Sequence, residues 1–208
     1  MPLEWVRRRV NNKALWRSDA VWRNVLQTPK PHSSKREPNL RTDEADASVM
    51  GRAGVICEAS HKPTKGRVAH FTVVEGKPSG LRRRFVAWPK GENDRNDREA
   101  EAPLRHVSRY LGAMFGEVAT VFDLKAPFFR VSLPQSSRTS FRCRAERGML
   151  VEPTRLPMGR KCGPEVLHTV ARVLAGDAAV VGSRYAAPKS LTIHVWVDNI
   201  RISGRSRT

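Results

Sequence analysis

The stretch LTIHVWVDNIRIS, residues 191–203, constrains the fold most, because its apolar positions follow two strand patterns in opposite phase. Those positions are Leu191, Ile193, Val195 and Val197, followed by Ile200 and Ile202. Side chains alternate between the two faces of a strand, so this change of phase predicts two strands joined by a tight turn. Asp198 and Asn199 are predicted at its tip, since both tolerate a left-handed backbone. A turn role alone would explain them.

Other segments predict a mixed α+β chain. Short strands are expected at residues 54–60, 67–76, 80–89 and 117–124, and a hairpin at residues 140–157. Apolar residues at helical spacing predict one helix over residues 102–116 and another that opens at Pro164 and closes at Gly176. This order favours an antiparallel sheet with helices on one face.

Composition divides the chain into three parts. Residues 1–27 carry three tryptophans among arginines, which predicts one or two basic amphipathic helices. Such helices either pack onto the later domain, which we favour, or face nucleic acid. Residues 28–53 are rich in proline, serine and charge and are predicted to be a flexible linker, and residues 54–208 form the main domain.

The charge of the chain predicts a polyanionic partner. Lys and Arg number 38 against 20 Asp and Glu, which gives a net charge of +18. Nucleic acid is the favoured partner, although charge alone does not exclude an anionic membrane surface. The three cysteines, Cys57, Cys143 and Cys162, form no CxxC pair and indicate reduced thiols. No signal peptide or membrane span is visible, so we expect an intracellular protein, nuclear or cytoplasmic.

A second acidic residue, Asp123, follows the apolar run VATVF in the same way that Asp198 follows HVWV. Two neighbouring strands that end in carboxylates would bring hard oxygen ligands to one edge of a sheet. That is the arrangement that two-metal phosphoryl transfer with Mg²⁺ or Mn²⁺ requires. Spacing alone supports this weakly, because Asp123 also suits a strand end.

Three segments between and around these residues resemble the palm of reverse transcriptases, particularly those of long-terminal-repeat-type retroelements. They are FDLKAPFFRVSLPQSSRTSFRCR at residues 122–144, TRLPMGRKCGPEVLHTV at residues 154–170 and HVWVDNI at residues 194–200. The stretch GLRRRFVAWPKGEN, residues 80–93, is similar to the fingers strand of that family. The resemblance covers residues 54–204. It implies a palm-like antiparallel sheet, partial fingers and RNA-directed DNA synthesis by a retrotransposon enzyme.

The resemblance also implies the metal ligands. Asp123 would be the first ligand, with the Leu124 carbonyl beside it, and Asp198 the second. The family carries two aspartates at the hairpin tip, whereas this chain has Asp198 followed by Asn199. Asn199 supplies a neutral oxygen, so metal binding and catalysis are expected to be weaker. Trp196 stands at the place of the family's tyrosine.

Nucleotide contacts follow from the same resemblance. Phe128 would lie under the sugar and exclude a 2′-hydroxyl, although a core phenylalanine would fit the sequence equally. Arg83 and Arg84 would approach the triphosphate, or form a solvated basic strand. Met158 and Gly159 would lie against template and nucleotide, with glycine permitting close backbone approach.

The implied partners are an RNA template, a DNA primer or duplex, and deoxynucleotides, with no membrane. Only eight residues follow the HVWVDNI segment, so the fragment is expected to end before the thumb, which a separate polypeptide could supply. Activity of this fragment is therefore expected to be weak or absent. The alternative is a non-catalytic, basic nucleic-acid-binding remnant of a polymerase palm. An RNA-directed RNA polymerase fits Phe128 and the LPMG segment less well.

Overall fold

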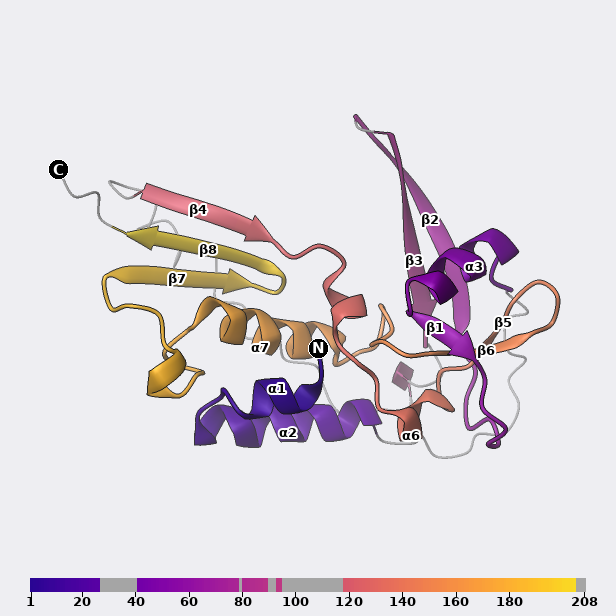
Figure 1. Ribbon diagram of the computed structural model, residues 1–208, viewed down its shortest axis with the longest axis horizontal. Helices are drawn as coiled ribbons and strands as arrows, with labels where there is room; N and C mark the ends of the chain where they lie inside the picture. Colours follow the sequence, from indigo (N-terminus) through magenta and orange to yellow (C-terminus); the bar gives the residue numbers. More distant parts are fainter. Residues whose placement is uncertain (27–40, 79, 90–92, 95–117, 205–208) are drawn as a thin grey trace. The chain divides into compact units, whose positions relative to one another are not determined.

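The computed structural model describes residues 1–26, 41–78, 80–89, 93–94 and 118–204 (Figure 1). The chain divides into two compact units that interleave along the sequence. The first comprises Met1–Arg23, Ala100–Pro127 and Pro164–Thr208, and the second comprises Asn24–Glu99 and Phe128–Gly163. The helix predicted over residues 102–116 lies outside the described residues.

The first unit contains a three-stranded antiparallel sheet in the order β4-β8-β7. Its strands are β4 (Val118–Asp123), β7 (Leu191–Trp196) and β8 (Asn199–Gly204). Helix α7 (Gly163–Ala175) lies along one face of this sheet (Figure 1). Ala171 and Ala175 of α7 pack against Val195 and Ile200, which face each other across β7 and β8. The predicted α+β fold, with a helix on one face of an antiparallel sheet, is confirmed.

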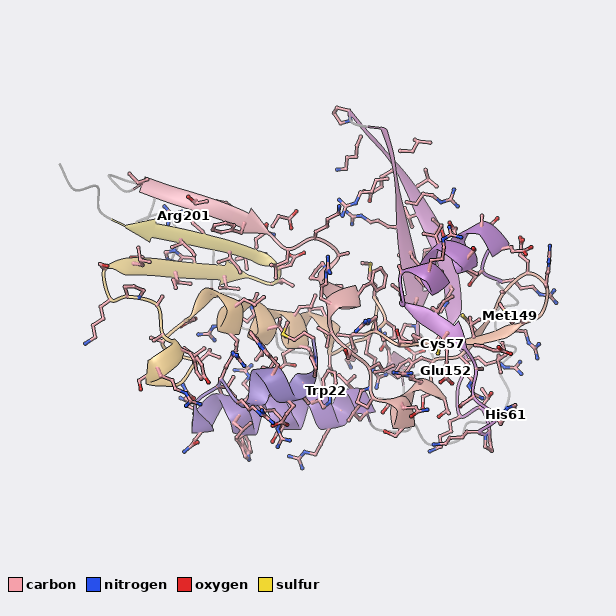
Figure 2. The ribbon with its side chains drawn as sticks, in the orientation of Figure 1. Trp22, Cys57, His61, Met149, Glu152 and Arg201 are labelled. Atoms are coloured by element: carbon pink, nitrogen blue, oxygen red, sulfur yellow. The ribbon has the colours of Figure 1, made fainter. Side chains whose placement is uncertain are left out.

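Alternation along the strands sends polar residues to the other face of the sheet. Arg201, labelled on β8 in Figure 2, pairs with Val121 of β4 and His194 of β7. Asn199 and Asp123 lie on this same face, two residues along. All six residues of β4 are exposed to solvent. Asp123, Asn199 and Arg201 therefore share one face of the sheet with Val121 and Trp196.

The N-terminal segment forms two helices, α1 (Leu3–Arg7) and α2 (Asn12–Leu26), as predicted. Val10 forms a β-bridge with Val181, and the Asn11 amide donates to the Val180 carbonyl at 2.8 Å. Val21 and Trp22 are buried. These helices therefore contact a later part of the chain, near the short 3-10 helix η3 (Ser183–Tyr185).

The second unit is built around a long hairpin and a small sheet. Strands β2 (Ala69–Lys77) and β3 (Gly80–Trp88) pair over nine residues each and extend beyond α3 as a ribbon (Figure 1). The sheet has the order β1-β6-β5, with β1 (Ile56–Glu58), β6 (Leu150–Pro153) and β5 (Cys143–Arg144). Short helices η2 (Pro127–Arg130) and α6 (Gln135–Arg138) precede β5.

The prediction of a linker over residues 28–53 is wrong for its last part, where Glu44–Arg52 forms helix α3. Asp43 caps this helix by accepting hydrogen bonds from the amides of Ala45 and Asp46. Ala47 and Met50, three residues apart, are buried in the core of the second unit. Only these two buried positions show helical spacing, and the residues around them are largely charged or polar, so the sequence pattern did not predict the helix.

The hairpin tip is also displaced from its predicted position. β7 ends at Trp196 and β8 begins at Asn199, so Val197 and Asp198 form the turn. Asn199 pairs with Trp196 on one side and with Asp123 on the other. A shift of two residues in register keeps the same side chains on each face, so the apolar pattern could not decide between the two turns. Pairing of Asn199 with both neighbouring strands places it inside β8.

None of the helices in the described parts of the chain is long and apolar enough to cross a membrane.

Candidate functional site

The acidic strand ends predicted from the sequence meet at one edge of the β4-β8-β7 sheet. Asp123 is the last residue of β4 and pairs directly with Asn199, the first residue of β8. The Leu124 amide donates to the Asp198 carbonyl at 3.1 Å, which continues the β4–β8 ladder into the turn. Paired residues of an antiparallel ladder have Cα atoms about 5 Å apart. The structure therefore brings Asp123 close to Asp198 and Asn199, although Asp123 and Asp198 are 75 positions apart in the sequence.

Asn199 is in contact with its neighbour. Its Nδ2 donates to Asp198 Oδ1 at 3.3 Å, a long and solvent-exposed hydrogen bond. An aspartate at this position would instead set a second carboxylate beside Asp198. The contact orients the amide nitrogen toward Asp198, and it shows that residue 199 reaches the carboxylate predicted to hold metal.

The donor set at this edge consists of oxygen atoms, the kind of ligand that Mg²⁺ and Mn²⁺ prefer. Asp123 is exposed and Asp198 half-buried, so both carboxylates are accessible to solvent. Hard divalent cations are bound by one or two carboxylates with water and substrate oxygens completing the shell. No group of three or more His, Cys, Asp or Glu suited to a metal is present in the described residues. Two carboxylates and the neutral Asn199 are what this edge offers.

Backbone strain flanks the acidic edge on both sides. Val197, directly before Asp198, has φ 53°, and Ala126, three residues after Asp123, has φ 49°. A β-branched residue at positive φ is a true outlier, and each such position costs about 1 to 3 kcal/mol. Strain of this kind is concentrated at functional sites, so its position beside both carboxylates is consistent with a site here.

The predicted phosphate-binding arginines lie on opposite faces of the β2–β3 hairpin, because they are consecutive on β3. Arg83 donates two hydrogen bonds to Asp46 of α3, from Nε to Oδ1 at 3.0 Å and from Nη2 to Oδ2 at 2.8 Å. Thr72 also donates to Asp46, at 2.6 Å. Arg84 pairs with Glu75 at 3.2 Å. Both guanidinium groups are thus engaged by carboxylates.

The hydrogen bonds between Arg83 and Asp46 shift the pKa values of both side chains. The hydrogen bond from Arg83 is the main reason why the pKa of Asp46 lies below its ordinary value, and Thr72 adds to it. The pKa of Arg83 is raised, chiefly by the same hydrogen bond. Asp46 therefore stays ionised and holds the arginine toward α3. A phosphate would have to compete with this carboxylate for the same planar guanidinium group.

Phe128 lies in η2 and is half-buried. A Cβ atom added to Gly163 would come within 2.8 Å of Phe128 Cε1, so the ring occupies the space that the glycine leaves. Gly163 was not predicted to contact Phe128, although its place just before Pro164 is a signal for a helix start. The predicted contact of Phe128 with a sugar stays a prediction.

Met158 and Gly159 form a turn that is tied to the end of β3. Gly159 has φ 107°, and a Cβ atom there would lie 2.5 Å from the Ala87 carbonyl oxygen. The backbone at Gly159 therefore lies close to β3. The predicted contact of Met158 and Gly159 with template and nucleotide stays a prediction. Asn93 holds the turn from the same side: its Nδ2 donates to the Gly159 carbonyl at 2.7 Å, and its Oδ1 accepts from the Lys161 amide at 2.9 Å. Asn93 was missed, because nothing in the sequence around it indicates a contact with residues 159 and 161.

A buried ion pair supports the second unit and was also missed. Arg142 donates to Glu152 of β6, labelled in Figure 2, from Nε at 3.1 Å and Nη2 at 3.0 Å. Its remaining donors reach the Lys62 carbonyl at 2.6 Å and the Ser60 carbonyl at 2.7 Å. Nothing in the local pattern around Arg142 distinguishes a buried arginine from the many exposed ones. It anchors the segment between β1 and β2.

The site residues fall into two groups. Asp123, Leu124, Asp198 and Asn199 belong to the first unit, and Arg83, Arg84, Phe128, Met158 and Gly159 belong to the second.

The architecture defines an α+β fold of the reverse-transcriptase kind. No family model matches the sequence, and no curated protein matches it. Among solved structures, the chain is similar to the crystal structure of the prototype foamy virus protease-reverse transcriptase, with a TM-score of 0.57 and 19% identity. The match covers 86% of this chain and 22% of the viral chain, so this chain spans about a fifth of that protein's length. At this identity the likeness establishes the fold.

Proposed function

We propose that this chain is a reverse-transcriptase-like domain of a retrotransposon, whose parent activity is RNA-directed DNA synthesis. The observation that carries the proposal is the pairing of Asp123 with Asn199 beside Asp198, at the edge of an antiparallel sheet of this fold. Asp123 and Asp198 would hold Mg²⁺ or Mn²⁺. Divalent ions at such a site supply charge neutralisation when a primer 3′-hydroxyl attacks the α-phosphate of a deoxynucleotide.

The chain's own residues would bind and orient the reactants. Arg83 on β3 would take a phosphate after releasing Asp46, since the guanidinium fork that grips a carboxylate also fits a phosphate. Phe128 would pack against the sugar. The Met158–Gly159 turn, held by Asn93, would present a fixed backbone to the base pair. RNA template, DNA primer and deoxynucleotides are the partners in this proposal.

Asn199 makes metal binding weak in this proposal, because it removes one negative charge from a site for divalent cations. The test is Mn²⁺ binding, followed through the relaxation of water protons, in the unmodified chain and four variants. Asn199→Asp should bind Mn²⁺ at least about tenfold more tightly, since ligand charge largely sets affinity. Asp123→Asn and Asp198→Asn should abolish binding, and Asp94→Asn, a described carboxylate outside the site, is the control. Equal binding by all four variants would refute the metal site.

A non-catalytic nucleic-acid-binding remnant is the second candidate, favoured by Asn199 and by the engagement of Arg83 with Asp46. Primer extension on RNA and DNA templates with Mg²⁺ or Mn²⁺ separates the two. We expect the unmodified chain to extend a primer little above background. Clear template-dependent synthesis that is lost in Asp198→Asn would refute the remnant and show that Asp198 with Asn199 suffices. Nucleic acid should bind in either case, with affinity that falls steeply as salt rises.

A further inference from the structure

Helix α2 has one buried face and one exposed, basic face. At about 100° per residue, Ser18, Val21, Trp22 and Val25 fall on one side, and all four are buried. The opposite side carries what we call the α2 basic face, which consists of Lys13, Trp16, Arg17, Ala20 and Arg23. Packing accounts for the first face and leaves the second unexplained.

Trp16 is the large aromatic residue of the α2 basic face, and its side chain is exposed to solvent. It is 73% exposed, whereas Trp22 on the buried side of the same helix is 5% exposed. Lys13 lies one turn before it and Arg17 directly after it, so a large aromatic surface is bordered by cations. Packing of α2 against the rest of the protein does not explain why Trp16 is exposed to solvent. Exposed aromatic residues among cations are typical of surfaces that bind single-stranded nucleic acid.

The charges on this face remain accessible. Arg17 lies 3.6 Å from Glu165, yet 47% of its side chain is exposed. Arg23 donates to the Asp19 carbonyl, a neutral group, at 3.3 Å. Within the described residues no ion pair involves Lys13. Residues 1–23 carry six basic side chains and two acidic ones, so the surroundings are positive as well.

We propose that the α2 basic face binds a single-stranded polynucleotide, with Trp16 stacked on an unpaired base and Lys13, Arg17 and Arg23 against the phosphates. Stacking is possible with every base, so binding has little sequence preference. Duplex binds less well, because its bases are not available to Trp16. The face lies outside the segments that resemble a polymerase and needs no metal.

An anionic membrane is a poorer partner for this helix. Amphipathic helices bind membranes by burying their apolar face among the lipids. In α2 that face is already occupied, since Val21, Trp22 and Val25 are buried inside the protein. A single exposed tryptophan is left, which favours a partner with many phosphates and accessible rings.

The experiment measures binding of the full chain to fluorescein-labelled 20-nucleotide single strands of RNA and DNA, and to a 20-base-pair duplex, by anisotropy without divalent metal. Trp16→Ala should weaken single-strand binding by about 5- to 100-fold, and Trp16→Phe should retain most of it. Leu174→Ala is the matched control, because Leu174 is an exposed apolar residue of a helix in the same unit. Lys13→Gln should reduce the salt dependence by about one unit of slope. RNA and DNA are both accepted by this chemistry.

Three results would overturn the proposal: Trp16→Ala that binds within twofold of the unmodified chain, an equal loss for duplex and single strand, or Trp16-dependent binding to vesicles of phosphatidylserine in place of the oligonucleotides. Trp16 is exposed, so its variants should fold, and circular dichroism checks this. Because the assay contains no metal, loss of the Mn²⁺ site and loss of this surface are separate outcomes.

Discussion

Replacing Gly159 by alanine tests how the Met158–Gly159 turn is placed. The structure gives two costs: positive φ, worth about 1 to 2 kcal/mol for a non-glycine residue, and an overlap of the new Cβ with the Ala87 carbonyl oxygen at 2.5 Å. Backbone oxygen cannot rotate away, so the overlap should cost a further 1 to 3 kcal/mol or so, as overpacking does. The expected loss of unfolding free energy is therefore about 2 to 5 kcal/mol.

Gly80 provides the matched control, because its φ is 115° and a Cβ atom there would meet nothing within 4 Å. Gly80→Ala should lose only the backbone term, about 1 to 2 kcal/mol. Urea denaturation followed by circular dichroism gives both values. Equal losses in the two variants would refute the close approach of Gly159 to β3. If the turn also presents backbone to a nucleotide, Gly159→Ala should weaken deoxynucleotide binding, whereas Gly80→Ala should not.

Three further predictions concern the fold and the acidic edge. Val197→Gly should relieve the strain at φ 53° and raise the unfolding free energy by about 1 kcal/mol in urea titrations; an unchanged or lower value would contradict a strained turn. Burial lowers the pKa of His70 from 6.5 to about 4, so on acidification the unfolded chain takes up the proton before the folded chain does. The unfolding free energy should therefore fall by about 1.4 kcal/mol for each pH unit by which the pH is lowered between these two values. His70→Phe should lack this part of the pH dependence, and an identical pH profile would refute it. Asn93→Ala should lower the unfolding free energy by about 1 to 3 kcal/mol, because the Gly159 carbonyl and the Lys161 amide lose their partner. Asn12→Ala, on the exposed surface of α2, should leave it unchanged. Equal urea midpoints for the two variants would show that Asn93 does not hold the turn.

The strands at the acidic edge and the mixed α+β class could be predicted from the sequence, because both depend on the local spacing of apolar residues. The VATVF and HVWV runs each end in a carboxylate, and antiparallel pairing of two such strands brings the carboxylates together. Residues whose role depends on distant partners could not be predicted in this way. Asn93 reaches the Gly159 turn 66 positions away, and Arg142 contacts Ser60 and Glu152 from different segments. Nothing in the sequence next to Asn93 or Arg142 indicates these distant contacts.

The ion pair between Arg83 and Asp46 bears on the choice between polymerase and remnant. An exposed pair contributes little to stability, so its presence is weak support for a structural role. Asp46 also accepts from Thr72, and its carboxylate thereby joins α3 to both strands of the hairpin. If Arg83 serves only the fold, Asp46→Asn should reduce stability and leave nucleotide affinity unchanged. If Arg83 takes a phosphate, the same variant frees the guanidinium group and should strengthen triphosphate binding, while Arg83→Gln should remove that gain. Filter binding of a labelled deoxynucleoside triphosphate to the two single variants and the double variant decides the matter, because a remnant would show no such coupling between residues 46 and 83.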